Sequence, residues 1–152
     1  MKRIGKRPDF DLAREFPIKK PFLFIDAVRE FVEGKCLIAE KSVTGDESFF
    51  RGHFPGQPVM PGHLIAEALV QCCGLYRGLT VRGTDEDRVF LLTSSKVSFF
   101  KPVLPPATLI MTCEPVKIVS FGGVFSARAR VKRTLVAQGQ FTLAFGRQKR
   151  NK

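Results

Sequence analysis

The stretch GHFPGQPVMPGHLIAEALVQ, residues 52–71, holds both histidines of this chain and three of its ten prolines. Its one carboxylate, Glu67, follows His53 by fourteen residues and stands among Leu, Ile, Ala and Val. The first part is rich in Gly and Pro, which is typical of a loop with a fixed backbone. The second part predicts a helix over residues 63–77. A carboxylate in such an apolar helix needs a structural or a chemical reason.

The rest of the chain predicts a single α+β domain over residues 1–152, with short basic tails at both ends. Residues 9–16 predict a short helix capped by Asp9 or Asp11. Period-two alternation and short apolar runs predict strands at 22–32, 35–43, 89–100, 107–119, 124–134 and 136–145. Breaks are expected at Glu33 and Gly34, over the loop 44–62, at Pro102, Pro105 and Pro106, at Gly122 and Gly123, and near Leu135.

The predicted helix is apolar on nearly all sides, which indicates that it is buried. Its polar side chains His63, Glu67 and Gln71 are four residues apart, so they share one stripe. A polar stripe on a buried helix must face polar partners. Two explanations stay open for it, a satisfied structural network and a functional site.

His53 lies in the Gly/Pro-rich loop that leads through Pro61 and Gly62 into the helix. A helix start presents unpaired backbone N–H groups and the positive end of the helix dipole, which suits an oxyanion. An imidazole can remove a proton near neutral pH. A carboxyl buried like Glu67 should have a raised pKa and can act as an acid. This set suits proton abstraction next to a carbonyl with loss of a β-hydroxyl, or the reverse hydration.

Composition narrows the class of protein. The net charge is +11, which suits an acidic partner through long-range attraction or simply a solvated positive surface. Nucleic-acid binding rests on charge alone, since no binding motif accompanies it. No signal peptide or apolar run of membrane-spanning length is recognised, and the four cysteines lack zinc-site spacing. We therefore expect reduced thiols, no metal site and a cytoplasmic protein.

The motif His53-Phe54-Pro55, Pro58, Pro61-Gly62, then Glu67, Ala68 and Gln71 resembles the signature of the β-hydroxyacyl-[acyl carrier protein] dehydratases of fatty acid synthesis. Glu at the acid position is similar to the FabZ type, because FabA-type enzymes carry Asp there. Three further segments, KPFLFIDAV at 20–28, GDESFFRGH at 45–53 and FFKPVLP at 99–105, are similar to family motifs. The resemblance implies a hotdog fold, in which a long helix is wrapped by a curved antiparallel sheet.

The resemblance also implies roles, in a homodimer that shares its active sites between subunits; further assembly of dimers into a higher oligomer stays open. His53 would take the C2 proton, and Glu67 of the other subunit would protonate the leaving hydroxyl. The Gly62 N–H would hold the thioester oxygen, and Gln71 would position the carboxyl or a water. Phe54 and His63 are further substrate-binding candidates, and a Phe-lined tunnel would hold the acyl chain. Lys101, where the family often has Arg, is a candidate contact for an acidic acyl carrier protein; no cofactor is implied.

Departures from the family pattern bear on substrate choice. His63 stands where FabZ proteins usually have Val, so its ring is expected to narrow the pocket or to hydrogen-bond Glu67. Ile18-Lys19-Lys20 and Pro105-Pro106-Ala107 also differ from the family. These changes suit a specialised relative in polyene or lipid synthesis. The alternatives are a hotdog acyl thioesterase and a non-catalytic acyl-binding hotdog subunit.

Overall fold

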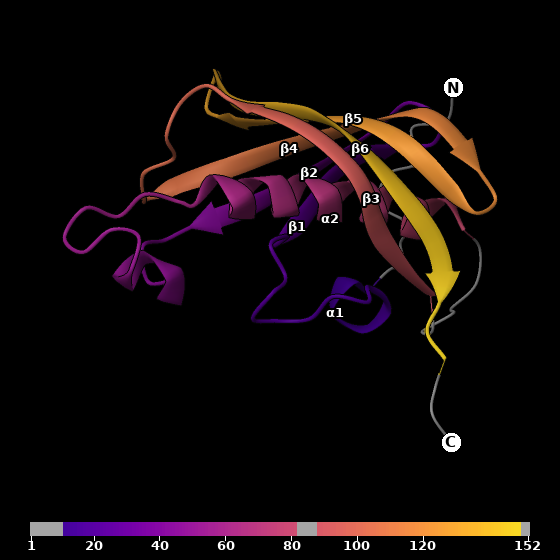
Figure 1. The fold of residues 1–152 in the computed structure, drawn as a ribbon, viewed down its shortest axis with the longest axis horizontal. Helices are drawn as coiled ribbons and strands as arrows, with labels where there is room; N and C mark the ends of the chain where they lie inside the picture. Colours follow the sequence, from indigo (N-terminus) through magenta and orange to yellow (C-terminus); the bar gives the residue numbers. More distant parts are fainter. Residues whose placement is uncertain (1–10, 82–87, 150–152) are drawn as a thin grey trace.

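One long helix, α2 (Gly62–Thr80), runs along the concave face of a curved six-stranded antiparallel sheet in the computed structural model, which describes residues 11–81 and 88–149 (Figure 1). The strand order is β1-β2-β4-β5-β6-β3, so β1 and β3 are the sheet edges. The strands are β1 (Ala27–Val32), β2 (Cys36–Val43), β3 (Arg88–Phe99), β4 (Ala107–Val119), β5 (Gly122–Val131) and β6 (Thr134–Arg147). The predicted α+β hotdog arrangement is confirmed.

The core lies between α2 and the sheet. In β4 the alternate residues Leu109, Met111 and Cys113 are fully buried, while the residues between them are only partly buried. In α2 every residue from 68 to 76 is buried. The prediction of a buried helix is therefore confirmed for its middle, but its first turn carries the exposed side chain of His63. The helix also continues three residues beyond the predicted end, to Thr80.

Residues 22–26 were expected to extend the first strand, and this was wrong. β1 begins only at Ala27. At Phe22 and Phe24 the backbone bonds to a side chain: Phe24 N–H donates to Gln71 Oε1 at 2.8 Å, and Phe22 O accepts from Gln71 Nε2 at 2.7 Å. Directly before β1, Asp26 N–H donates to Glu40 O of β2 at 2.8 Å. Gln71 thus takes the place of a strand partner at Phe22 and Phe24.

The break expected at Gly122 and Gly123 was also wrong, because both residues lie in β5 and the turn is made by Ser120 and Phe121. A Cβ added at Gly122 would lie 2.6 Å from the carbonyl oxygen of Leu143 in β6. Glycine is required here by the close approach of two backbones. The next turn is made by Lys132 and Arg133, before Leu135.

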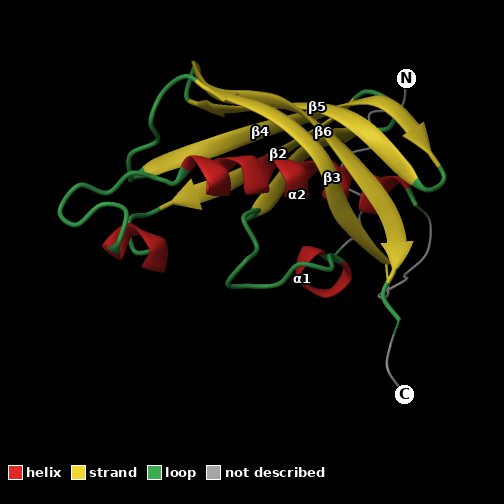
Figure 2. Ribbon diagram, in the orientation of Figure 1, coloured by secondary structure: helices red, strands yellow, loops and turns green. Residues whose placement is uncertain are grey.

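Two short helices flank this framework. α1 (Leu12–Glu15) is capped by Asp11, whose Oδ1 accepts from Ala13 N at 3.0 Å and Arg14 N at 3.2 Å. The alternative cap Asp9 lies outside the described residues. The 3₁₀ turn η1 (Ser48–Arg51) sits in the long loop before α2, at the left of Figure 2. This loop was predicted to contain no helical structure, so η1 was not expected. The loop brings His53 to the start of α2.

Candidate active site

The loop of residues 52–60 holds His53 by short backbone bonds. Phe54 N–H donates to Gln57 O at 3.0 Å, and Gln57 N–H returns a bond to Phe54 O at 2.9 Å. Met60 N–H donates to Val103 O at 2.9 Å, which fastens the loop to the segment after β3. The position of the imidazole is therefore set by backbone geometry and depends little on neighbouring side chains.

Val59 fixes the His53 ring. Its N–H donates to His53 O at 3.0 Å, and its carbonyl oxygen lies 2.7 Å from His53 Nδ1. A carbonyl oxygen can only accept, so Nδ1 carries a hydrogen. In the neutral ring this leaves Nε2 with a lone pair that can take a proton. The ring of Phe54, half exposed, stacks on His53 with centroids 4.0 Å apart.

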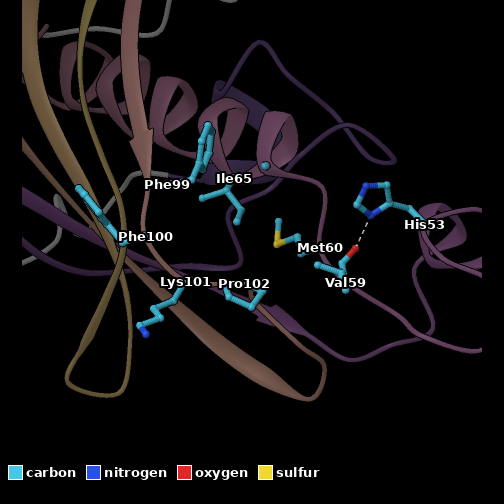
Figure 3. A pocket seen from close by; sticks show the side chains of 9 residues that line it. His53, Val59, Met60, Ile65, Phe99, Phe100, Lys101 and Pro102 are labelled. Atoms are coloured by element: carbon cyan, nitrogen blue, oxygen red, sulfur yellow. Dashed lines mark hydrogen bonds between the residues drawn. The ribbon is translucent and has the colours of Figure 1, made fainter.

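A pocket of about 320 Å³ opens beside this imidazole. In Figure 3, His53 lies on one side of it, Phe99 and Ile65 lie on the other, and the Lys101 side chain extends away from His53. The pocket is lined by His53, Val59, Met60, Gly62, Ile65, Phe99, Phe100, Lys101 and Pro102. Most of these side chains are apolar, so the pocket suits an apolar group next to a polar reacting centre.

The start of α2 forms part of the same pocket through Gly62. Pro61 O accepts from both Leu64 N at 3.0 Å and Ile65 N at 3.2 Å. The N–H groups of Gly62 and His63 have no acceptor among the described residues. A Cβ on Gly62 would lie 3.3 Å from the Phe99 ring, so glycine keeps the backbone and this ring in close contact.

Glu67 lies on the next turn of α2, partly buried. Burial raises the pKa of its carboxyl, as the sequence predicted, while a hydrogen bond from Gln71 lowers it. That bond runs from Gln71 Nε2 to Glu67 Oε1 at 3.1 Å. The described residues include no hydrogen bond between His63 and Glu67.

Gln71 is completely buried and fully engaged. Its Oε1 accepts from Phe24 N–H, and its Nε2 donates to both Phe22 O and Glu67. An amide has two N–H donors, so both are used. Gln71 therefore contacts the carboxyl rather than an open pocket, and it links the segment before β1 to Glu67.

The structure does not bring His53 and Glu67 into one pocket within a single chain. His53 and Gly62 line the pocket together, but Glu67 is not among the lining residues. Glu67 follows Gly62 by five residues, which in an α-helix places it about 140° around the axis and about 7.5 Å along it. The acid and the backbone donor of one chain thus face different sides of α2.

The sequence missed most of the apolar lining, namely Met60, Ile65 and Phe99 as individual residues. Phe99 opens the F-x-x-P segment, which could have identified it. The backbone contacts of Phe22 and Phe24 with Gln71 have no sequence signal, because every residue carries the same amide. Lys101, predicted as a partner contact, lies at the pocket rim.

The described residues contain no group of three or more His, Cys, Asp or Glu side chains that could hold a metal ion. Within the same ranges, no helix is long and apolar enough to cross a membrane.

Comparison with known proteins identifies the family. Residues 16–140 match the FabA-like domain. The chain is 44% identical over 132 residues to 3-hydroxyacyl-[acyl-carrier-protein] dehydratase FabZ of Nitratidesulfovibrio vulgaris strain DP4, with 84% of each chain covered. It is 38% identical over 130 residues to the enzyme of the same name from Ehrlichia chaffeensis, covering 86% of this chain and 89% of the relative.

Solved structures agree on the fold. The dehydratase heterocomplex ApeI:P from Xenorhabdus doucetiae has a TM-score of 0.74 and 13% identity, with 93% of each chain covered. A hypothetical thioesterase from Streptococcus pneumoniae TIGR4 has a TM-score of 0.60 and 13% identity, covering 82% of this chain and 88% of that chain. At these identities the likeness shows the fold alone, whereas the sequence matches show the family. The chain therefore belongs to the FabA-like family, among its FabZ-type dehydratases.

Proposed function

We propose that this protein dehydrates (3R)-3-hydroxyacyl-[acyl carrier protein] to trans-2-enoyl-[acyl carrier protein] in fatty acid or related acyl-chain synthesis. The observation that carries the proposal is the His53 ring, held at Nδ1 by Val59 O at 2.7 Å in a pocket that also contains the free N–H end of α2. The dehydratases that are 36–44% identical over more than four fifths of the chain support the same reaction.

In the proposed reaction, His53 Nε2 takes a proton from C2 of the substrate. The thioester oxygen, which gains negative charge, accepts from the N–H of Gly62. The electrons of the C2–H bond form the C2–C3 double bond, and the C3–O bond breaks. Glu67 gives its proton to the leaving hydroxyl, which departs as water. Each step is assigned to a group of the protein, so the proposed reaction needs no cofactor.

Glu67 is proposed to come from a second copy of the chain, because one chain does not place it in the His53 pocket. The edge strand β3 offers the contact: within the described parts of the chain it pairs only with β6, and Leu91 on it is 67% exposed. Leu92 and Phe99 on the same strand are also exposed. A long edge with exposed apolar side chains favours pairing with another strand. Pairing of two β3 edges would give a homodimer. The ApeI:P heterocomplex suggests an alternative, in which a different chain of the same fold pairs with this edge.

The whole chain is proposed to act as one catalytic domain in the cytoplasm. All four cysteines are free thiols, and Cys72, Cys73 and Cys113 are buried. Burial raises the pKa of each of these three thiols, so they are poor nucleophiles and suit a core. Free thiols of this kind support a reducing compartment.

The test is enoyl absorbance from a short 3-hydroxyacyl thioester. Wild type should form enoyl product, while His53→Ala and Glu67→Gln should each lose about 10²–10⁴-fold in rate. His63→Ala removes the other histidine, whose exposed ring does not line the pocket, and should retain activity. Release of free thiol without enoyl product from wild type would instead indicate a thioesterase.

A mixing experiment tests the shared site. Two inactive variants, His53→Ala and Glu67→Gln, are combined under conditions that let dimers exchange. Half of the dimers are then mixed, and each contains one intact site, so about a quarter of wild-type activity should return. No recovery after demonstrated exchange would contradict a site built from two chains.

A further inference from the structure

The end of the β4–β5 hairpin carries an uninterrupted run of exposed, mostly apolar side chains. Every residue from 116 to 121, the hairpin tip, is exposed. Four of them are Val116, Ile118, Val119 and Phe121, and Phe121 at 73% is the most exposed large apolar side chain in the described part of the chain. Apolar residues scattered singly are ordinary on a protein surface, whereas a contiguous group marks a contact site.

The hairpin tip has a fixed position, and the rest of the chain does not cover it. Phe145 N–H donates to Phe121 O at 2.9 Å, which ties the tip to β6. In Figure 1 the β4–β5 turn lies at the right, at the opposite end of α2 from the start of this helix. The strands β6 and β3 separate β5 from the edge proposed to form the dimer. Pairing of two β3 edges would therefore leave the tip exposed.

Apolar side chains of the hairpin tip lie on both faces of the hairpin. Ile118 pairs with Gly123 and Val119 pairs with Gly122 across β4 and β5. Successive side chains on a strand point to opposite faces, so these two exposed residues face opposite ways. A protein partner would cover one face, whereas the acyl region of a bilayer surrounds an inserted tip on both. The tip therefore fits a membrane surface better than a protein partner.

Charge near the hairpin tip favours an anionic membrane. Lys117 lies within the tip, and residues 115–149 contain seven Lys and Arg but no Asp or Glu. The preceding acidic residue, Glu114, is paired with Arg128 at 3.1 Å. Lys and Arg at a membrane surface are attracted to anionic headgroups. Acidic residues at 85–87 lie outside the described residues, so we give the apolar side chains the main role and the cations the second.

We propose that the hairpin tip is a membrane-surface contact, which inserts Phe121 and its apolar neighbours among the acyl chains of an anionic bilayer while Lys117 meets the lipid phosphates. The contact goes beyond the proposed dehydration, since it uses no residue of the His53 pocket. A tip of this length enters only the interfacial region, so the protein lies on the membrane without spanning it.

Vesicle co-sedimentation of the full chain tests the contact. Wild type should bind vesicles that contain about one third phosphatidylglycerol about ten-fold more tightly than vesicles of phosphatidylcholine alone. Phe121→Ser should weaken binding to the anionic vesicles by about ten-fold. The matched control is Leu104→Ser, which removes a 55% exposed side chain before β4 and should change binding less than about two-fold. Both positions are exposed, so both variants should unfold in urea like wild type.

Fluorescence reports insertion directly. The chain contains no Trp, so a single introduced Trp reports only its own surroundings. With anionic vesicles, the indole of Phe121→Trp should emit at shorter wavelength and be quenched by brominated lipid. The indole of Leu104→Trp should show neither change.

Three results would overturn the proposal. Equal vesicle binding by wild type and Phe121→Ser would indicate general charge attraction, and failure of wild type to bind anionic vesicles would remove the contact altogether. If wild type ignores vesicles and Phe121→Ser lowers the assembled mass in light scattering, a second copy of the chain covers the tip instead. None of these measurements uses enoyl formation, so they fail or succeed independently of the proposed function.

Discussion

Replacing Gln71 by Met tests the connection between the segment before β1 and the candidate acid. The substitution keeps the length of the side chain but removes its three hydrogen bonds, to Phe24 N–H, Phe22 O and Glu67. The Phe24 N–H is buried and would be left without a partner, whereas Phe22 is half exposed, so water can reach its carbonyl oxygen. A buried polar group left without a partner costs about 1–3 kcal/mol. The free energy of unfolding should therefore fall by about 1–3 kcal/mol.

The assay is urea unfolding at a fixed protein concentration, which matters for a protein proposed to dimerise. Gln140→Met is the matched control, because Gln140 is an exposed glutamine on β6. The control should stay within about 0.5 kcal/mol of wild type. If Gln71→Met were no less stable than the control, the backbone clamp would contribute nothing, and the reasoning would be refuted.

The same variant has a kinetic consequence. The Gln71 bond lowers the pKa of Glu67 against the raising effect of burial. Without that bond the pKa should rise further, so the protonated acid persists to higher pH. The limb of the pH–rate profile that reports loss of this proton should move to higher pH, whereas a purely structural loss would lower the rate without moving it.

Two further predictions concern stability. Burial raises the pKa of Glu67, so the stability that its protonated form contributes is present below the unfolded pKa and is lost as pH rises through the folded pKa. Wild type should therefore lose free energy of unfolding relative to Glu67→Gln as pH rises above the ordinary Glu pKa of about 4.3, and parallel pH curves would contradict this. Gly122→Ala would place a Cβ 2.6 Å from Leu143 O and should destabilise the fold by about 1–3 kcal/mol in urea unfolding, while Gly146→Ala, with nothing within 4 Å, serves as its control.

Elements with strong periodicity were predictable from the sequence. The strand expected at 107–119 is β4 as observed, and the buried middle of α2 follows from its run of apolar residues. Glycine was misread at residue 122, because a turn and a close backbone approach both require a missing side chain. Only the position of Leu143 on the neighbouring strand distinguishes the two.

The chemistry of the candidate site was less predictable than its residue types. The sequence pointed to His53, Gly62 and Glu67, but it could not show that Val59 O fixes the tautomer of His53. It also could not show that the Gln71 amide hydrogen-bonds to the backbone of Phe24 and Phe22, which lie 47 and 49 residues earlier in the chain. Both contacts are made by backbone N–H and C=O groups. Because nearly every residue type carries the same groups, the sequence does not reveal which of them form these contacts.

The geometry of α2 supports the proposal that the site is built from two chains. The free N–H groups at a helix start point along its axis, whereas an acid five residues later points sideways, about 140° around from the first. A substrate held at the Gly62 N–H and beside His53 therefore cannot also reach Glu67 of the same helix without leaving that pocket. A second α2, brought alongside through paired β3 edges, can present its own Glu67 to the substrate instead. On this argument the site requires both the exposed edge of β3, which brings the second chain alongside, and the half-buried acid that this chain supplies. Disrupting the edge should therefore remove activity, even though each chain keeps its own His53, Gly62 and Glu67.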